Sequence, residues 1–188
     1  MIHLGCEIIK QKRVWMAVHK GSGHATDDQT DLSRAAHDDV MVTHVKRRGE
    51  KMTRIINVYD QTDVQTAERQ VSKRNWPRAI GQRGSIMIVG DMNVHSRRWD
   101  PSYREQCNGM FREEIIDGNE LDIGNDDDRP THHWARNGQE GKSTIDVTLA
   151  TRPSMRWTIL DKIHSTASDY QVIDCKFKVN TQKEADHV

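Results

Sequence analysis

The chain has 188 residues, with 28 lysines and arginines balanced by 28 aspartates and glutamates, so its formal net charge is zero. This length suits one domain, and the zero net charge excludes a strong overall field that would draw the chain to nucleic acid or membranes. Hydrophobic residues make up 35% of the sequence, which is low for a globular domain, but clear apolar runs exclude a disordered chain. No run reaches the roughly 18 apolar residues that cross a bilayer, and no signal-peptide pattern is present, so we expect an intracellular protein.

Cysteine and histidine spacing gives no framework for a disulfide or a zinc ion. Cys6, Cys107 and Cys175 are odd in number and far apart, which favours reduced thiols. The ten histidines match neither the C-x-x-C nor the H-E-x-x-H spacing. The adjacent His132 and His133 would point to opposite faces of a strand. The sequence therefore does not predict a dedicated zinc site.

Short runs rich in valine and isoleucine, bounded by glycine, aspartate and asparagine, predict β-strands along the whole chain. The polar segment 46–51 predicts a hairpin loop between two antiparallel strands. Segment 85–89 is continuously apolar, which predicts a central strand buried on both faces. The predicted strands are residues 13–18, 40–45, 54–59, 85–89, 143–150, 157–160 and 172–179.

Two helices are predicted between the strands, over residues 64–82 and about 104–117. Pro77 predicts a kink or a division of the first helix, because proline inside a helix costs about 3 kcal/mol. Gly138, Gly141 and the polar run 126–130 mark loops. Without a repeat or a linker, we expect one domain of mixed strands and helices over residues 1–180 and a polar tail at 181–188.

Polar residues with catalytic potential follow the predicted strand 85–89, in the segment V-G-D-M-N-V-H at 89–95. Asp91 and Asn93 lie two residues apart, so on an extended segment both side chains point into one cleft. There the acid would align a water molecule and the amide would hold a phosphate oxygen. An Asx-type turn that leads the chain out of the strand accounts equally well for the same two residues.

Three further residues stand at or near predicted strand ends. Asp146 lies within an apolar, β-branched strand, where a buried carboxylate needs a partner. It either orients a catalytic side chain or faces outward from a strand whose alternate residues face the core. Asp169 precedes the last predicted strand, where a loop would place it in the same cleft. Tyr59 ends the strand 54–59 as a hydrogen-bond donor or as an amphipathic edge of the core.

The order of these segments carries a resemblance to a known family. From about residue 13 to residue 179 the sequence resembles the endonuclease/exonuclease/phosphatase superfamily. It is most similar to the endonuclease domain of non-LTR (LINE-type) retrotransposon polyproteins, which belongs with DNase I and the apurinic/apyrimidinic endonucleases. The segments are N-V-Y at 57–59, G-D-M-N-V-H-S at 90–96 with Trp99, T-H-H-W at 131–134, S-T-I-D-V-T-L at 143–149 and S-D-Y at 168–170.

The resemblance implies a four-layered α/β sandwich, in which two mixed sheets are flanked by helices and a Mg²⁺-dependent phosphodiesterase site lies at one end of the strands. By motif, Asp91 would align or activate the attacking water, Asn93 would fix that water or a phosphate oxygen, and Tyr59 would contact the phosphate. Asp146 would orient the active-site histidine, and Asp169 would lie in the metal or nucleophile shell. The metal would supply Lewis acidity and neutralise developing charge.

The same resemblance implies DNA as the partner and no membrane. It also implies a place in the nucleus and within a longer reverse-transcriptase polyprotein.

Two features depart from the family pattern. The family ends in Ser-Asp-His, whereas Tyr170 stands at the histidine position, so a phenol of pKa about 10 replaces an imidazole of about 6.5. The family also begins with a strand–helix–strand unit that carries an Asn and a metal-binding Glu. Residues 1–12 contain only Glu7, in surroundings that do not match.

We therefore expect the domain to lack that first unit and its principal metal ligand. The chain should show little or no Mg²⁺-dependent nicking, and Tyr170→His alone should not restore it.

Three functions remain open from the sequence. The chain is an endonuclease that nicks target DNA to prime reverse transcription, a catalytically inactive remnant, or a nucleic-acid-binding module without the chemistry. Basic side chains available for phosphate contacts also suit a solvated hairpin, so they do not decide between these functions. These side chains are Lys46, Arg47, Arg48, Lys51 and Arg54, with Arg97 and Arg98 beside the Asp91 motif.

Overall fold

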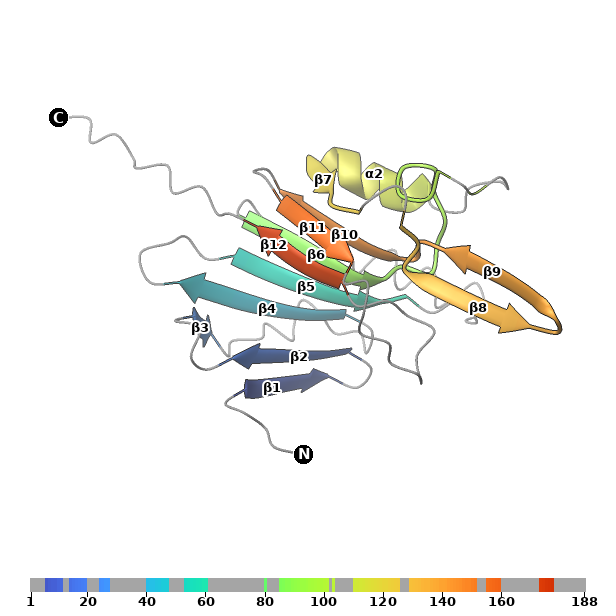
Figure 1. Ribbon diagram of the computed structural model, residues 1–188. Coiled ribbons are helices and arrows are strands. Elements are labelled where there is room, and N and C mark those ends of the chain that lie inside the picture. The colour runs from blue at the N-terminus through green and yellow to red at the C-terminus, as the bar shows by residue number, and fades with distance from the viewer. Residues whose placement is uncertain are drawn as a thin grey trace.

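The computed structural model describes residues 6–11, 14–19, 24–27, 40–47, 53–60, 80, 85–101, 103, 110–125, 129–151, 155–159 and 173–177. Most of the elements in these ranges are strands (Figure 1). In chain order the elements are β1 (Cys6–Gln11), β2 (Val14–His19), β3 (His24–Asp27), β4 (Val40–Arg47), β5 (Thr53–Tyr59), β6 (Ser85–Asp91), α2 (Met110–Gly118), β7 (Leu121–Ile123), β8 (His132–Arg136), β9 (Gln139–Ser143), β10 (Asp146–Thr151), β11 (Met155–Ile159) and β12 (Ile173–Phe177).

A mixed sheet in the order β3-β4-β5-β6-β10-β7 forms the centre of the structure. β5 and β6 run parallel, and the other neighbouring pairs are antiparallel. β4 and β5 pair from Val40↔Val58 to Val45↔Thr53, which confirms the predicted hairpin. β6 lies between β5 and β10 and is buried along most of its length, so the prediction of a central strand is also confirmed.

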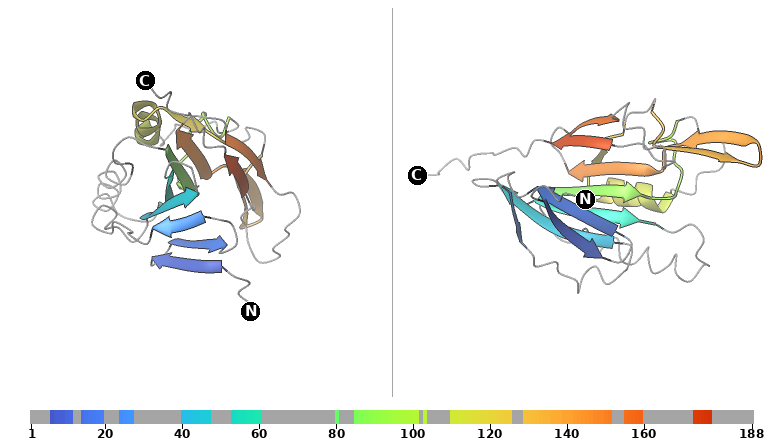
Figure 2. Two further views of the ribbon diagram at one scale, coloured as in Figure 1. Left: turned by 90° about the vertical axis from the view of Figure 1, so that its left-hand side faces the viewer. Right: turned by 60° about the horizontal axis from the view of Figure 1, so that its bottom comes forward.

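Three smaller sheets accompany the main one. β1 and β2 pair antiparallel, and β2 contacts β4 and β5. β11 and β12 form a second antiparallel pair. β8 and β9 form a hairpin that projects away from the main sheet (Figures 1 and 2). This mixed sheet with additional sheets and a helix is an α/β architecture, as predicted.

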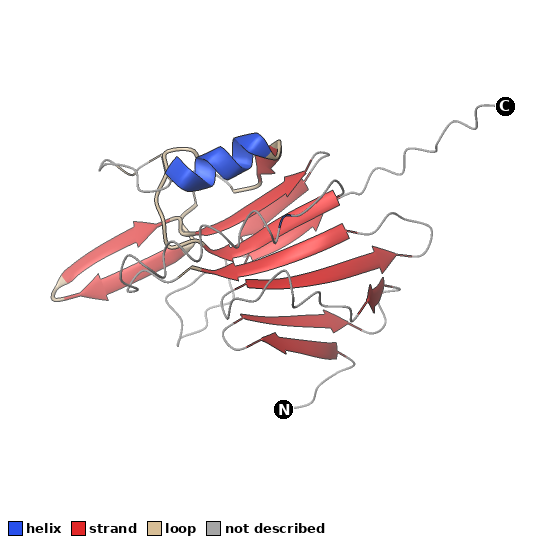
Figure 3. Cartoon of the chain, turned by 180° about the vertical axis from the view of Figure 1, so that it is seen from behind, coloured by secondary structure: helices blue, strands red, loops and turns tan. Residues whose placement is uncertain are grey.

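The apolar core lies on the main sheet and beneath α2 (Figure 3). The helix contacts β7 and buries Ile115 and Ile116. It covers the second half of the predicted helix 104–117, whose residues 104–109 lie outside the described residues. Its partners in the core include Val40, Val42, Ile56, Val58, Ile80, Ile86, Ile88, Met92, Trp99, Leu121, Val147 and Leu149.

Two other sequence-based expectations lie outside the described residues. The predicted helix 64–82 is described only at Ile80, which is buried in the core, and the polar tail 181–188 is not described. The division into a domain over 1–180 and a tail stays a prediction. Among the described residues, no helix combines the length and the apolar character needed to cross a membrane.

The prediction of one strand over residues 143–150 is wrong. Ser143 ends β9, and β10 begins only at Asp146. The chain turns between them because side chains bind the intervening amides. Thr144 N donates to Asp100 Oδ2 at 3.1 Å, and Ile145 N donates to Thr131 Oγ1 at 3.2 Å. These tertiary hydrogen bonds override the β-propensity of the local sequence.

The β8–β9 hairpin confirms the predicted loop at Gly138, which lies in its turn, but the prediction of a loop at Gly141 is wrong, because Gly141 lies within β9. Asn137 and Gly138 form the two-residue turn, with φ of 53° and 75°. Positive φ at both central positions defines a type I′ turn, for which Asn-Gly is a preferred sequence. The expected opposite orientation of His132 and His133 on a strand is confirmed, since His132 is half-buried and His133 is exposed.

Gly90 is required where β6 approaches β5. Its φ is 136°, and a Cβ there would overlap backbone atoms of Val58, its partner in β5. We expect Gly90→Ala to lower the free energy of unfolding by about 3 kcal/mol or more, because strain and a backbone clash add together.

Urea denaturation measures this effect, with Gly118→Ala as the matched control. A Cβ at Gly118 meets no atom within 4 Å. The control should change stability by less than about 1 kcal/mol. Equal stability of the two variants would contradict the close approach at Gly90.

Candidate active site

Three of the predicted site residues lie side by side at one edge of the main sheet. Tyr59 ends β5, Asp91 ends β6 and Asp146 begins β10. Tyr59 is the register partner of Asp91, and Asp91 is the register partner of Asp146. Because β5 and β6 run parallel and β10 runs antiparallel to β6, the C-terminal ends of β5 and β6 lie at the same end of the sheet as the N-terminal start of β10. The fold thus gathers side chains from three distant segments.

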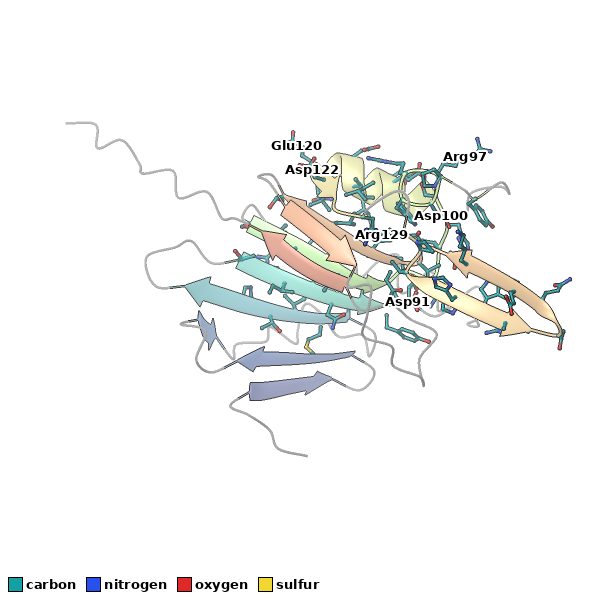
Figure 4. The ribbon with its side chains drawn as sticks, viewed as in Figure 1. Asp91, Arg97, Asp100, Glu120, Asp122 and Arg129 are labelled. Atoms are coloured by element: carbon teal, nitrogen blue, oxygen red, sulfur yellow. The ribbon has the colours of Figure 1, made fainter. Side chains whose placement is uncertain are left out.

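Backbone hydrogen bonds beyond the strands fix this edge. Asp60 N donates to Asp91 O at 2.8 Å, and Met92 N donates to Ile145 O at 2.8 Å. Asp91 is 7% exposed, whereas Tyr59 is 36% exposed. The acid therefore lies at the floor of the site and the phenol at its rim. Figure 4 shows Asp91 near the base of the β8–β9 hairpin.

At Asn93 the chain leaves β6 through an Asx turn, which was one of the two interpretations of this segment from the sequence. Its φ is 46°, in the left-handed region that asparagine tolerates, and its backbone N donates to Asp91 Oδ1 at 2.8 Å. Its Nδ2 donates to the Asp60 carbonyl. The turn and the shared site are therefore compatible, because the Asx turn itself holds Asn93 beside Asp91.

Asp91 and Asp146 form a pair of like charges across β6 and β10. Burial, with the repulsion of Asp91 as the second cause, raises the pKa of Asp146 from 3.8 to about 7. Hydrogen bonds from Thr131 and from the backbone offset part of this shift. Within the described part of the chain, the buried Asp146 Oδ2 has no hydrogen-bond partner. The site therefore holds an excess of negative charge and one unused carboxylate oxygen.

Thr131 positions Asp146 and was not predicted to do so. It is fully buried, and its Oγ1 accepts from Ile145 N at 3.2 Å and from Asp146 N at 3.1 Å. Its own N donates to Ser143 O at 3.1 Å. The signal available in the sequence was a threonine just before the hairpin, which does not reveal its partners.

A pocket of about 390 Å³ opens at the base of the hairpin, and its lining includes Asn93 and Ile145, which are close in sequence to the acid pair, but neither acid itself. Alternate residues of β8, which share one face of the strand, line it together with Asn93 and His95. Imidazole, indole and guanidinium groups there suit a phosphate with its attached base or sugar. The lining residues are Asn93, His95, His132, Trp134, Arg136, Ser143 and Ile145.

The remaining predicted residues are not placed in this site by the part of the chain that the structure describes. Asp169 and Tyr170 lie outside the described residues. Arg97 and Arg98 are exposed, and Arg98 forms an ion pair with Asp117 of α2 at 2.8 Å. In Figure 4, Arg97 lies beside α2 and is well separated from Asp91. The prediction that these arginines contact nucleic acid stays a prediction.

The donors present suit a hard divalent cation in part. Mg²⁺ commonly binds one or two protein carboxylates and keeps several waters, and the paired Asp91 and Asp146 provide such oxygens, one of them unpartnered. No cluster of three or more His, Cys, Asp or Glu side chains suited to a metal occurs among the described residues. The two acids therefore fit a cation whose coordination shell is completed by water and substrate oxygens.

The comparisons with known proteins agree with this geometry. The family model described as endonuclease-reverse transcriptase matches residues 53–174, more than half of the chain. The chain therefore belongs to this family, within the DNase I-like endonuclease/exonuclease/phosphatase superfamily. Among functionally curated proteins, no sequence match was found.

Solved structures show the same fold at low sequence identity. The endonuclease domain of TRAS1, a telomere-specific non-LTR retrotransposon, matches with a TM-score of 0.72 and 18% identity, covering 95% of this chain and 82% of that domain. TDP2 of D. rerio, complexed with a single-strand DNA product, gives 0.58 and 11%, with coverages of 91% and 76%. The 3′ phosphatase NExo from Neisseria, bound to a product DNA hairpin, gives 0.57 and 14%, with 92% and 79%.

The buried acid pair should make stability depend on pH. Well below pH 3.8, Asp146 is protonated in both the folded and the unfolded chain. Its pKa is about 7 in the folded chain and 3.8 as a free side chain, so the unfolded chain loses this proton at a lower pH than the folded chain. The free energy of unfolding therefore falls as the pH rises from 3.8 to about 7. Asp146→Asn removes this loss. In EDTA we expect this variant to melt several degrees above the wild type at pH 8.

At pH 4 the difference between the two melting temperatures should be much smaller. Thermal unfolding monitored by circular dichroism at both pH values measures it, with Asp122→Asn as a control for an exposed acid. An Asp146→Asn variant that is less stable than the wild type at pH 8 would show that Asp146 has a stabilising partner.

Proposed function

We propose that this chain is a metal-dependent DNA endonuclease domain that hydrolyses phosphodiester bonds at a low rate. The observation that carries the proposal is the alignment of Tyr59, Asp91 and Asp146 on three adjoining strands, with Asn93 and Ile145 from the neighbouring turns in the lining of the pocket. The family membership and the fold support it, and two of the solved structures with this fold contain a DNA product.

Each side chain has a role that its surroundings support. The buried carboxylate of Asp91 would accept a hydrogen bond from the attacking water and align it. The Nδ2 of Asn93 donates to a carbonyl, so its side-chain oxygen remains for the water or for a donor in the active site. Tyr59 would donate its hydroxyl to a phosphate oxygen at the rim. When no cation is bound, a proton on Asp146 near neutral pH would reduce its repulsion of Asp91.

Asp91 and Asp146 are the described residues that would hold Mg²⁺. When bound, the ion would supply Lewis acidity and would offset the negative charge of the phosphate and of the two acids. Asp169 would add a further carboxylate, as the sequence motif predicts. The excess negative charge at the acid pair is the structural observation that supports a cation here.

The low rate follows from Tyr170, which stands where the family motif has histidine. A phenol still donates a hydrogen bond, but it lacks the positive charge of an imidazolium. Loss of one such positioned group commonly reduces the rate about 10²- to 10⁴-fold.

The biological setting we propose is that of a non-LTR retrotransposon endonuclease. The domain would nick chromosomal DNA in the nucleus to prime reverse transcription, as part of a longer polyprotein that includes a reverse transcriptase. The description of the matching family and the fold shared with the TRAS1 domain support this setting.

Nicking of supercoiled plasmid tests the proposal. We expect slow conversion to the open circular form with Mg²⁺ and none with EDTA. Asp91→Ala should reduce the rate by about 10² or more, because it removes the buried acid. Asp122→Ala is the matched control, since Asp122 is an exposed acid on β7 that Figure 4 places near the far end of α2.

Two results would contradict the proposal. Nicking that Asp91→Ala leaves unchanged would come from another site or from a contaminant. No Mg²⁺-dependent nicking at any protein concentration, combined with salt-sensitive DNA binding, would instead support a binding module without chemistry.

A further inference from the structure

The outer edge of β10 is only partly covered by a strand. β7 pairs with residues 149–151 of β10 and ends at Ile123, whereas β6 pairs with the opposite edge. In the part of the chain that the structure describes, no strand pairs with residues 146–148 on the outer edge. The main-chain groups of this stretch therefore need other partners there, because an amide or a carbonyl that is buried without one costs free energy.

Asn125, two residues beyond the end of β7, supplies two of these partners. Its Nδ2 donates to Asp146 O at 2.8 Å, and its Oδ1 accepts from Thr148 N at 2.8 Å. A side-chain amide carries the same kinds of donor and acceptor as a peptide group, so this one side chain takes the place of a strand. Gly124 N adds a last main-chain bond to Thr148 O at 2.8 Å.

Thr131 completes the set of partners. Its Oγ1 accepts from Asp146 N at 3.1 Å, so side chains bind both the amide and the carbonyl of Asp146. β6 holds the opposite edge of β10, where Asp146 is paired with Asp91. The main chain that carries Asp146 is therefore held on both sides, against the repulsion that would move the two acids apart.

We propose that Asn125 is a positioning residue for the reaction, which holds Asp146 beside Asp91 by replacing a strand at the edge of the site. The inference rests on the proposed function. Asn125 would act through the main chain of Asp146, without contacting the DNA or the cation itself. A displacement of about 1 Å at a reacting group can lower a rate about 10²-fold. Loss of Asn125 should therefore reduce the rate of hydrolysis more than the affinity for DNA.

The first test follows the carboxyl group of Asp146 without catalysis. Carbon-13 NMR spectra are recorded between pH 3 and 9 in EDTA for the wild type and for Asn125→Ala. We expect the pKa of Asp146 to fall from about 7 toward 3.8 in the variant, because the freed strand lets the carboxylate move toward water and away from Asp91. An unchanged pKa of Asp146 in folded Asn125→Ala would overturn the inference.

Asn119→Ala is the matched control for this test. Asn119 is half-buried like Asn125, and its Nδ2 also donates to a main-chain carbonyl, that of Ile115 at 2.8 Å, but it lies just after α2. Thermal unfolding monitored by circular dichroism should show a loss of stability in both variants. The pKa of Asp146 should stay at its wild-type value in Asn119→Ala. An equal fall of this pKa in both variants would show that it follows stability in general and would overturn the inference.

The second test separates rate from binding. With Mg²⁺ and saturating plasmid, Asn125→Ala should lower the nicking rate constant about 10²-fold. Its affinity for a short DNA duplex, measured by fluorescence anisotropy in EDTA, should change less than about threefold. Asn119→Ala should keep both wild-type values.

Asn125→Asp tests the bond to the Asp146 carbonyl by itself. Aspartate keeps an acceptor for Thr148 N but turns an oxygen toward the carbonyl of Asp146, so this variant should lose as much rate as Asn125→Ala. Wild-type nicking by either variant of Asn125 would overturn the inference.

The results also separate this inference from the proposed function. If the wild type does not nick but Asn125→Ala lowers the pKa of Asp146, hydrolysis is excluded and the placement of Asp146 by Asn125 stands. If the wild type nicks and Asn125→Ala matches it in rate and in the pKa of Asp146, the proposed function stands and the inference fails.

Discussion

The site depends on one constraint, the direct pairing of Asp91 with Asp146 across β6 and β10. Both strands are buried on both faces, with Ile88, Val147 and Leu149 almost fully buried. The start of β10 is fixed by the amides of Thr144 and Ile145, which donate to Asp100 and Thr131. The fold therefore brings two carboxylates together at the sheet edge. The energetic cost of this arrangement appears as the pKa of Asp146, raised to about 7. Such a cost is typical of functional sites, where a cation or a proton relieves it.

The surrounding loops hold the pair in place through hydrogen bonds, most of which connect segments that are distant in sequence. Thr131 binds the two amides at the start of β10, and Asn93 closes a turn on Asp91. Asp100 connects the loop after β6 to the turn before β10 and also faces His95. A single rigid frame thus supports the acid pair and the imidazole beside it. This frame fits a reaction in which the protein must present preorganised charges to a phosphate.

Much of this arrangement could be predicted from the sequence. The continuous apolar run before Gly90 predicted the central strand, and the motif order predicted the fold and the residues at the strand ends. The break at Thr144 could not be predicted, because the amides of Thr144 and Ile145 donate hydrogen bonds to Asp100 and Thr131, which are distant in sequence. The β8–β9 hairpin was missed although Asn137-Gly138 is a strong local signal, since the flanking residues are too polar to read as strands. The pairing of His95 with Asp100 likewise exists only in the folded loop.

The central claim is that Asp91 and Asp146 form one buried, electrostatically coupled pair. Carbon-13 NMR of the aspartate carboxyl groups tests it most directly, with Asp146 followed between pH 3 and 9 in the wild type and in Asp91→Asn. In the wild type, Asp146 should titrate with a pKa of about 7. In Asp91→Asn its pKa should fall but stay above 3.8, because burial is the larger cause of the shift and the repulsion is the smaller. A pKa near 4 in the wild type, or no change on removing the charge of Asp91, would contradict the account.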